Sequence, residues 1–419
     1  MVREKLPKFV FLGASLLSVG ITLAILGFMV LLAYPLFARG MFWNMLIQPW
    51  SPDQGLFGLG PMIVGTLSIA SLAVCISFPI SCGVACFAGI IHPRGKGRTL
   101  RQMVEAMTAI PTVIYGFVGI FLLVPLVREL FAEGSGMCIL SAGIMLGVLI
   151  SPTMILFFIQ SFTLVPQPYL NAADALGANT VQKFFYIVLP CAWKSMATGL
   201  ILSFGRAMGD TLIALMISGN AVGFPGSLLD SARTLTAHIG LIIAADFDSI
   251  EFKTLFLHHY FFDRLYPCLL ISALSLAFLV LPYMIRTTQM ALENLPMDVR
   301  ITAPSLGATQ FQNIFYVLLP ASLSIIVSGI ILSIGRCAED TAVIMLTGAV
   351  ATAGIPRSVF ASFEALPFYI YYISSQYADH SELMKGYGAC LVLIFICMIL
   401  FVLAHWIKQR LAQKLLYRS

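Results

Sequence analysis

The chain has 419 residues, of which 59% are hydrophobic and only 10% are charged. A soluble globular protein carries about 25% charged residues, so this composition excludes a water-soluble domain and favours an integral membrane protein. The formal net charge of +5 does not indicate nucleic-acid binding, because the basic residues do not gather on one soluble face.

Long apolar stretches follow one another along the chain. Each is at least about 20 residues long, which is enough for a helix to cross the roughly 30 Å hydrocarbon core of a bilayer. The sequence therefore predicts an all-α integral membrane protein of about eight transmembrane helices. The expected spans are residues 9–36, 62–91, 103–130, 138–164, 191–218, 265–285, 320–347 and 386–407.

The distribution of lysine and arginine predicts the orientation of these spans. Basic residues precede the first span, occupy the short loop 92–98 and follow the last span. Cytoplasmic loops are enriched in lysine and arginine, and an even number of crossings returns the chain to the side on which it began. We therefore expect a multi-pass protein of the inner (plasma) membrane with both termini in the cytoplasm.

Two loops between expected spans repeat each other, 130 positions apart and without a gap. In each, a glycine is followed after nine residues by Ile or Val, any residue, Leu and Pro. Glycine can turn the backbone between two short helices, and proline is favoured where a helix starts. The loops, residues 165–190 and 295–320, are expected to be interfacial helices or docking surfaces for a cytoplasmic partner. The repeated positions are Ala172, Ala173, Gly177, Leu189 and Pro190, and then Ala303, Gly307, Leu319 and Pro320.

Each loop leads into an apolar helix that carries a repeated charged cluster. Arg206 lies 16 residues after Pro190, about 24 Å along a helix, and Arg336 has the same offset from Pro320. A charge at this depth is costly unless it is paired or hydrated, and an aspartate four residues later would lie on the same helical face. The clusters comprise Arg206, Asp210 and Thr211, and then Arg336, Glu339, Asp340 and Thr341.

The charged clusters have two interpretations. One is a structural ion pair that holds two helices together. The other is an anion site on a transport path, where the two arginines face each other across a pseudo-two-fold axis. Guanidinium groups bind phosphate oxygens in a bidentate manner. In the second copy Glu339 stands where the first has Gly209, and this extra negative charge predicts a weaker or pH-sensitive site.

The repeated loops closely resemble the cytoplasmic coupling loop of ABC-importer permeases. That motif is Glu-Ala-Ala, three residues, Gly, nine residues, and Ile-x-Leu-Pro. Here the leading glutamate is replaced by Asn171 in the first copy and by Ile301 in the second, while the glycine-to-proline frame is intact in both. In the family this loop fits a groove on the ATPase, so the resemblance implies an ABC-importer permease fold and two cytoplasmic ATP-binding subunits as partners.

Further segments resemble the phosphate-specific permeases. The run from Gly205 to Thr211 is similar to their Gly-Arg-Ala-x-Gly-Asp/Glu-Thr signature, and residues 109–119, 231–237, 355–358 and 365–372 resemble other parts of their two permease subunits. The resemblance implies import of inorganic phosphate delivered by an external phosphate-binding protein. Three alternatives remain: a sulfate or molybdate permease, an ATP-independent anion transporter or channel, and a degenerate fusion that does not transport.

The chain is expected to combine two permease halves. Residues 1–260 would supply five helices, the coupling loop 165–190 and an external segment at 219–260. Residues 261–419 would supply three helices, the coupling loop 295–320 and an external segment at 348–385. Two complete family permeases would have about twelve helices, so the first half would lose its last helix near residues 252–262.

Nothing in the chain indicates catalysis. It contains no phosphate-cradling Gly-x-x-x-x-Gly-Lys-Ser/Thr motif, whose backbone N–H groups would hold a nucleotide. ATP hydrolysis is therefore expected on separate subunits. The nine cysteines form no C-x-x-C pair, and we predict no metal site and no cofactor.

Overall fold

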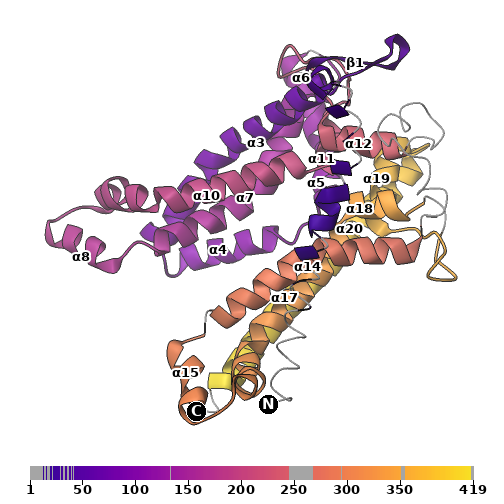
Figure 1. Ribbon diagram of the computed structural model, residues 1–419. Coiled ribbons are helices and arrows are strands. Elements are labelled where there is room, and N and C mark those ends of the chain that lie inside the picture. Colours follow the sequence, from indigo (N-terminus) through magenta and orange to yellow (C-terminus); the bar gives the residue numbers. More distant parts are fainter. Residues whose placement is uncertain are drawn as a thin grey trace. The chain divides into compact units, whose positions relative to one another are not determined.

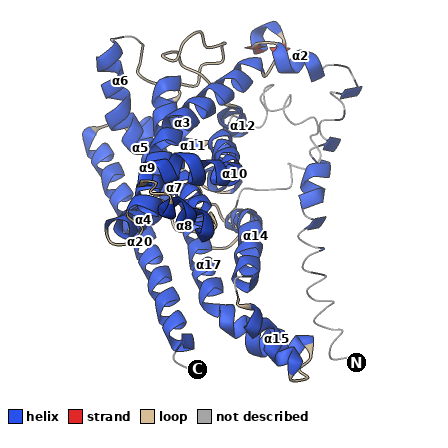
Figure 2. Cartoon of the chain, turned by 90° about the vertical axis from the view of Figure 1, so that its left-hand side faces the viewer, coloured by secondary structure: helices blue, strands red, loops and turns tan. Residues whose placement is uncertain are grey.

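Almost all of the secondary-structure elements in the computed structural model are helices (Figure 2). The structure describes residues 42–132, 134–244, 268–293, 295–350 and 354–416, together with scattered positions between 13 and 40. In this part a short antiparallel pair, β1 (Trp50–Ser51) and β2 (Leu56–Phe57), flanks the 3-10 turn η1 (Pro52–Gln54). The expected all-helical fold class is confirmed.

Six helices in the described part of the chain are long and apolar enough to cross a membrane. The expected first span, 9–36, falls largely outside the described residues, and so does the stretch 252–262. The expected seventh span coincides in part with helix α17 (Leu319–Glu339). The total of about eight spans stays a prediction. The six helices are Gly60–Ile91, Thr112–Phe131, Ile139–Thr163, Thr180–Gly209, Leu269–Glu293 and His380–Ile407.

Several of these spans are built from more than one helical element. The first runs from α3 (Gly60–Cys86) into the π-helical η2 (Phe87–Ile91), and the second joins α5 (Thr112–Val118), η3 (Gly119–Leu123) and α6 (Val124–Phe131). The fourth joins α9 (Thr180–Lys183), η4 (Phe184–Val188) and α10 (Leu189–Gly209). The remaining elements are α2 (Phe42–Ile47), α4 (Lys96–Met107), α7 (Ile139–Thr163), α8 (Gln167–Ala175), α11 (Leu212–Ile217), α12 (Leu235–Ala244), α14 (Leu269–Glu293), α15 (Met297–Ser305), α16 (Gln310–Gln312), η6 (Asn313–Leu318), α18 (Thr341–Thr347), α19 (Leu366–Gln376) and α20 (His380–Leu416).

The expected span 103–130 is wrong at its start. Residues up to Met107 belong to the separate helix α4, and α5 begins only at Thr112. Between them Pro111 takes an extended backbone, with φ −60° and ψ 143°. Proline has no N–H to donate to a preceding turn, and it disfavours helical geometry in the residue before it. Most of the sequence run is apolar, but this proline divides it.

The chain forms two compact units. One comprises residues 43–255 and 366–391, and the other comprises residues 1–42, 256–365 and 392–419. The first repeated loop and charged cluster belong to the former unit, and the second copies belong to the latter. We call them the first-copy unit and the second-copy unit.

Three long helices form the core of the first-copy unit. Helices α3, α7 and α10 pack against one another, and α4 lies along α7 (Figure 1). A Cβ at Gly147 of α7 would lie only 3.0 Å from the carbonyl oxygen of Ala73 in α3, and small residues allow such close approach between membrane helices. Figure 1 places α8 at one end of this bundle and α11 and α12 at the other.

The sequence repeat is also a structural repeat. Helix α14 (Leu269–Glu293) reproduces the length of α7 (Ile139–Thr163), and it packs against α17 as α7 packs against α10. The pairs α8 and α15, and α10 and α17, likewise begin and end at positions 130 residues apart. After each long helix the chain makes an isolated parallel bridge, between Gly219 and Ala232 and between Ala349 and Phe363.

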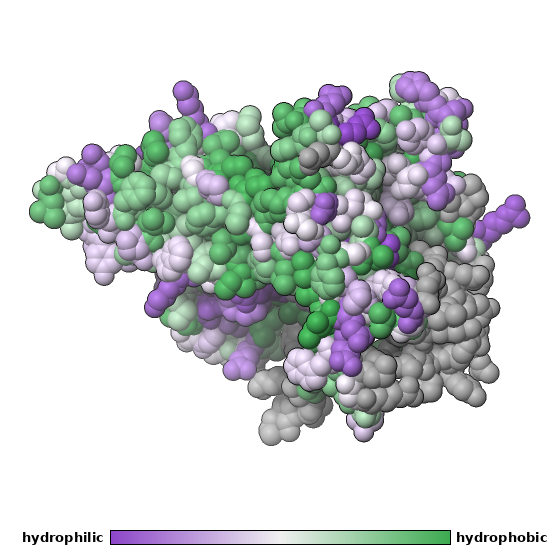
Figure 3. All heavy atoms as spheres, turned by 90° about the horizontal axis from the view of Figure 1, so that it is seen from above, coloured by the Kyte–Doolittle hydropathy of each residue, from purple (hydrophilic) through white to green (hydrophobic). Residues whose placement is uncertain are grey.

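Much of the molecular surface is apolar. Figure 3 shows hydrophobic residues over a large part of one face, with hydrophilic residues gathered in separate patches. Large side chains on the long helices are exposed, among them Leu67, Ile80, Leu122, Ile201, Leu391 and Phe395. Contiguous apolar surface of this extent is typical of a face that contacts lipid or another protein.

Candidate functional site

The long helix breaks at the aspartate of the charged cluster in both repeats. Helix α10 ends at Gly209, and Asp210 takes an extended backbone with φ −71° and ψ 122°. Helix α17 ends at Glu339, and Asp340 repeats this geometry with φ −75° and ψ 104°. In the second copy the Asp340 N–H still donates to the Arg336 carbonyl oxygen at 3.1 Å, so the turn follows the aspartate and does not precede it. The expectation that each aspartate lies on the face of its arginine stays a prediction.

The two aspartates act as caps of the short helices that follow the break. The Ile213 N–H donates to Oδ1 of Asp210 at 2.9 Å, and the Val343 N–H donates to Oδ1 of Asp340 at 2.8 Å. The first N–H groups of a helix have no partner within the helix, and an acidic side chain also interacts favourably with the helix dipole. Each carboxylate thus stabilises the first turn of α11 or α18.

The two arginines have different partners at equivalent positions. Nη1 of Arg206 donates to Oγ1 of Thr153 in α7 at 2.8 Å. The Arg336 guanidinium lies over the ring of Tyr283 in α14, 4.3 Å from its centre. Thr153 and Tyr283 are 130 residues apart, so they correspond in the repeat. Sequence reasoning missed both, although aligning the two copies one helix further back would have placed them opposite the arginines.

The other residues of the predicted clusters also lie at the break. Thr211 is half-buried and precedes α11, whereas Thr341 is fully buried and begins α18. Glu339 is the last residue of α17. Because Arg206 and Arg336 belong to different units, the expectation that they face each other stays a prediction.

A polar segment after α11 contacts the first break. The Thr236 hydroxyl donates to the carbonyl oxygen of Asp210 at 3.1 Å. Nε of Arg233 donates to the carbonyl oxygen of Asn220 at 2.9 Å, and Nη1 of Arg233 lies 3.4 Å from Nδ1 of His238. The His238 ring stands perpendicular to Trp50, with ring centres 4.3 Å apart. Sequence reasoning assigned this stretch to an external segment but did not single out Arg233 or His238.

Burial controls the charge of this segment. His238 is only 1% exposed, and its Nε2 has no hydrogen-bond partner among the described residues. Burial, together with the nearby Arg233 charge, lowers the pKa of His238 to about 4, because desolvation disfavours the charged imidazole. Burial also lowers the pKa of Arg233 from its ordinary value. His238 is therefore neutral near pH 7.

The glycine turn of each loop matches its prediction. Gly177 has φ +75° and Gly307 has φ +82°, a left-handed geometry that glycine adopts without penalty. The Ala178 N–H donates to the Ala173 carbonyl at 3.0 Å, and the Ala308 N–H donates to the Ala303 carbonyl at 3.0 Å. This pattern closes the C-terminus of α8 and of α15.

The chain re-enters a helix in the same way in both loops. Asn179 and Gln182 form a reciprocal cap at the start of α9, and Thr309 and Gln312 form one at the start of α16. Such caps satisfy otherwise unpaired N–H groups at a helix start. A π-helical stretch follows in each copy. The predicted loop residues Leu189, Pro190, Leu319 and Pro320 occupy the first two positions of α10 and α17.

Both loops expose large apolar side chains at corresponding positions. Leu176 and Leu306 are 88% and 83% exposed, and Tyr186 and Tyr316 are 80% and 77% exposed. We call the pair Leu176 and Tyr186, and its counterpart Leu306 and Tyr316, the loop patch of each copy. Of the predicted alanines, Ala173 is buried and Ala303 half-buried, whereas Ala172 is exposed. The loop patches leave apolar surface in each copy for a partner to cover.

The two loops differ in their charges. In the first copy, Nζ of Lys183 forms an ion pair with Asp174 at 2.6 Å. The corresponding positions of the second copy hold Asn313 and Pro304. There the Asn313 amide nitrogen donates to the carbonyl oxygen of Arg300 at 3.0 Å. The loops therefore share a backbone frame but present different polar groups.

Two segments of the chain match the family model described as "Binding-protein-dependent transport system inner membrane component". The first match covers residues 80–247 and the second covers residues 236–417. Together they span most of the chain, and each contains one repeated loop and one charged cluster.

Individual relatives match about half of the chain. It is 31% identical over 209 residues to the "Probable ABC transporter permease protein YqgH" of Bacillus subtilis, covering 49% of this chain and 68% of that protein. It is 30% identical over 226 residues to the "Phosphate transport system permease protein PstC" of Pasteurella multocida, covering 49% and 70%. It is 28% identical over 252 residues to the "Probable phosphate transport system permease protein PstC" of Methanocaldococcus jannaschii, covering 55% and 80%. No solved structure matches the chain.

Proposed function

Because the chain belongs to the family of binding-protein-dependent transport system inner membrane components, we propose that it is the permease of an ATP-driven importer of inorganic phosphate. Members of the family are non-catalytic, multi-pass components of an ABC import system. The system also includes an ATPase and a binding protein. The substrate, the number of ATPases and the orientation of the termini belong to the proposal.

The repeated pairing of a loop patch with an arginine at a helix break carries this proposal. In each copy the loop leads directly into the long helix whose other end holds the arginine. A partner that binds the loop patch can therefore move the arginine through a continuous helix, α10 or α17. We assign Gly177 and Gly307, with the adjoining repeated positions of residues 165–190 and 295–320, to two cytoplasmic ATP-binding subunits.

The arginines are proposed to line the substrate path. Arg206 is held by the Thr153 hydroxyl and Arg336 by the Tyr283 ring, and both side chains are exposed within the chain. A guanidinium group binds phosphate oxygens through paired N–H donors. The proposed path also includes Asp210, Thr211, Glu339, Asp340 and Thr341, which lie at or next to the two helix breaks. A carboxylate oxygen there can accept the hydrogen of a protonated phosphate.

Phosphate is favoured over other oxyanions by two observations. The first is the run Gly205 to Thr211, which resembles the phosphate-permease signature. The second is that relatives such as those of Pasteurella multocida and Methanocaldococcus jannaschii bear the name of phosphate transport system permeases. The chain would act as two permease halves, residues 1–260 and 261–419, in the inner membrane with both termini cytoplasmic. An external phosphate-binding protein would deliver the substrate.

Reconstitution tests this function directly. The chain would be placed in liposomes with its ATPase and a phosphate-loaded binding protein, and uptake of radiolabelled phosphate would be measured with ATP or with a non-hydrolysable analogue. We expect uptake of labelled phosphate with ATP and none with the analogue. Labelled sulfate or molybdate, offered in place of phosphate, should not be taken up.

Each other outcome identifies a different activity. Uptake of sulfate or molybdate without phosphate uptake would assign another oxyanion. Equal uptake with ATP and with the analogue would indicate an ATP-independent transporter. If a complex that retains its ATPase took up none of the three anions, the chain would be a non-transporting fusion.

A further inference from the structure

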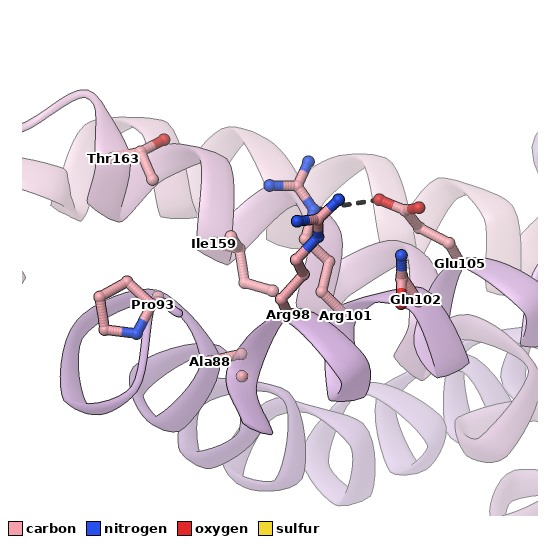
Figure 4. Close-up of a pocket in the computed structure, with 10 residues that line it drawn as sticks. Ala88, Pro93, Arg98, Arg101, Gln102, Glu105, Ile159 and Thr163 are labelled. Atoms are coloured by element: carbon pink, nitrogen blue, oxygen red, sulfur yellow. Dashed lines mark hydrogen bonds and ion pairs between the residues drawn. The ribbon is translucent and has the colours of Figure 1, made fainter. Parts of the chain in front are cut away.

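A pocket of about 360 Å³ lies apart from the charged clusters, between α4, η2 and the end of α7. Its polar lining comes mainly from α4, where the side chains of Arg98, Arg101 and Gln102 extend toward the same space (Figure 4). Ala88 and Ile159 add apolar surface, and Thr163 adds a hydroxyl group. The pocket thus combines two guanidinium groups with an apolar wall.

The charge around this pocket is strongly positive. Residues 92–101 contain Arg94, Lys96, Arg98 and Arg101 and no acidic residue. Arg101 is paired through Nε with Glu105 at 3.0 Å, whereas Arg98 makes no ion pair with any described residue. One guanidinium is therefore held in place by a carboxylate, and the other remains available to an anion.

The pocket sits where two membrane-crossing helices end. The span Gly60–Ile91 stops just before the basic segment, and the span Ile139–Thr163 ends at a residue that lines the pocket. Helix α4 buries Val104 and exposes Met103 by 60%, so it presents apolar surface beside its arginines. A helix of this kind lies at the boundary between water and hydrocarbon.

We propose that this pocket binds the phosphate headgroup of an anionic phospholipid. Basic residues immediately beyond a membrane helix, or in pockets between such helices, attract anionic lipid headgroups. Arg98 and Arg101 would bind the phosphate oxygens, while the wall formed by Ala88 and Ile159 would face the acyl chains. The site does not depend on the transport function proposed above.

Titration of the purified chain with phosphatidylglycerol in a neutral detergent tests the site. Native mass spectrometry would measure the fraction of chains that carry one lipid. We expect saturable binding of phosphatidylglycerol, and binding weakened by about 25-fold in Arg98→Gln/Arg101→Gln, because each basic residue near an anionic headgroup contributes about fivefold. The single change Arg98→Gln, which leaves the Arg101–Glu105 pair intact, should weaken binding about fivefold.

A matched variant removes two charges that do not line the pocket. Arg94→Gln/Lys96→Gln should weaken binding much less than Arg98→Gln/Arg101→Gln, because Arg94 and Lys96 do not line the pocket. Glu105→Gln should bind the lipid more tightly by freeing Arg101. Equal affinity in all variants, or equal binding of phosphatidylcholine, would overturn the proposal. If equimolar inorganic phosphate displaced the lipid, the pocket would be a free-phosphate site and the lipid assignment would be wrong.

Discussion

The two repeats hold their arginines by different interactions. Thr153 offers a hydroxyl oxygen to Arg206, whereas Tyr283 offers an aromatic face to Arg336. A hydrogen bond fixes the direction of one N–H group of Arg206. A cation–π contact acts on the face of the Arg336 guanidinium, so it does not fix the direction of the N–H groups at its edge. The same fold therefore presents two guanidinium groups with different freedom.

Removing the charges of one repeat tests whether its arginine serves transport. Glutamine can still donate to Thr153 and asparagine can still cap α11, so Arg206→Gln/Asp210→Asn should leave the protein inserted and bound to its ATPase. We predict that this variant and Arg336→Gln/Asp340→Asn each lose phosphate uptake in the liposome assay. The first should lose more, because Glu339 already adds a negative charge to the second site.

A control for these variants removes an arginine elsewhere. Arg286 is exposed on α14 and bonds Gln289 of its own helix, so Arg286→Gln should retain uptake. If either double variant transported phosphate normally, the arginine of that repeat would be structural. Full rescue by Arg206→Lys would also speak against bidentate binding of the anion, since lysine lacks the planar fork.

The aromatic contact of Arg336 predicts a graded effect. Tyr283→Phe keeps the ring, so uptake should change little. Tyr283→Leu removes it, and a cation–π contact of an exposed arginine is worth about 0.5–1 kcal/mol. We expect uptake at limiting phosphate to fall about two- to fivefold in Tyr283→Leu. An equal fall in Tyr283→Phe and Tyr283→Leu would instead implicate the hydroxyl, which both variants lack.

At the scale of elements, the loops combine a rigid frame with an exposed apolar tip. The glycine turn and the reciprocal cap hold Leu176 and Tyr186 outward, and the same frame holds Leu306 and Tyr316. A pre-formed surface binds its partner without a large cost of ordering. The loops are thus suited to transmit movement from an ATPase to α10 and α17.

The coupling glycines predict a selective loss of the ATPase. Apart from the adjoining residues, no atom of the described part of the chain lies within 4 Å of a Cβ built on Gly177 or Gly307. A side chain therefore fits there, but left-handed geometry costs other residues about 1–2 kcal/mol. A tryptophan would also cover the neighbouring loop patch. We predict that Gly177→Trp/Gly307→Trp remains in the membrane yet no longer co-purifies with the ATPase. Normal co-purification would rule out this role for the turns.

The buried histidine predicts a pH-dependent stability of the segment that contacts Asp210. The pKa of His238 is about 4 in the fold and about 6.5 when unfolded, so the unfolded chain binds the proton more tightly and acid favours unfolding. The stabilisation is complete above about pH 6.5 and is lost as the pH falls towards 4. Between pH 7 and pH 5 the thermal midpoint should fall, and it should fall less in His238→Gln. An equal fall in both proteins would exclude His238 as the cause.

Local chemistry made part of this architecture predictable from the sequence. Glycine at a positive φ is a requirement of a single position, so the turns at Gly177 and Gly307 were predicted. Pro190 and Pro320 do not start a new helix, because the helical run begins at Thr180 and Gln310 and continues through η4 and η6 into α10 and α17. The breaks at Asp210 and Asp340 were not predicted, because apolar residues continue on both sides and hide the change from one helix to two. The contacts of Arg206 with Thr153 and of Arg336 with Tyr283 join separate helices, so spacing within one helix could not predict them.

On the scale of the whole molecule, the chain carries two family matches and two copies of the loop-to-arginine helix. An ABC import system of this family includes an ATPase, and under the proposed coupling role the two loops on one chain would bind two ATPases. A homodimer would present four loops, of which two would be surplus. We therefore propose that a single chain supplies both coupling loops.

The mass of the assembled complex tests this claim most directly. The chain would be co-expressed with its ATPase, purified, and weighed by native mass spectrometry in the state that hydrolyses ATP. We predict one permease chain with two ATPase subunits. Two permease chains in the active complex would contradict the account and would show that helices are supplied by a second copy.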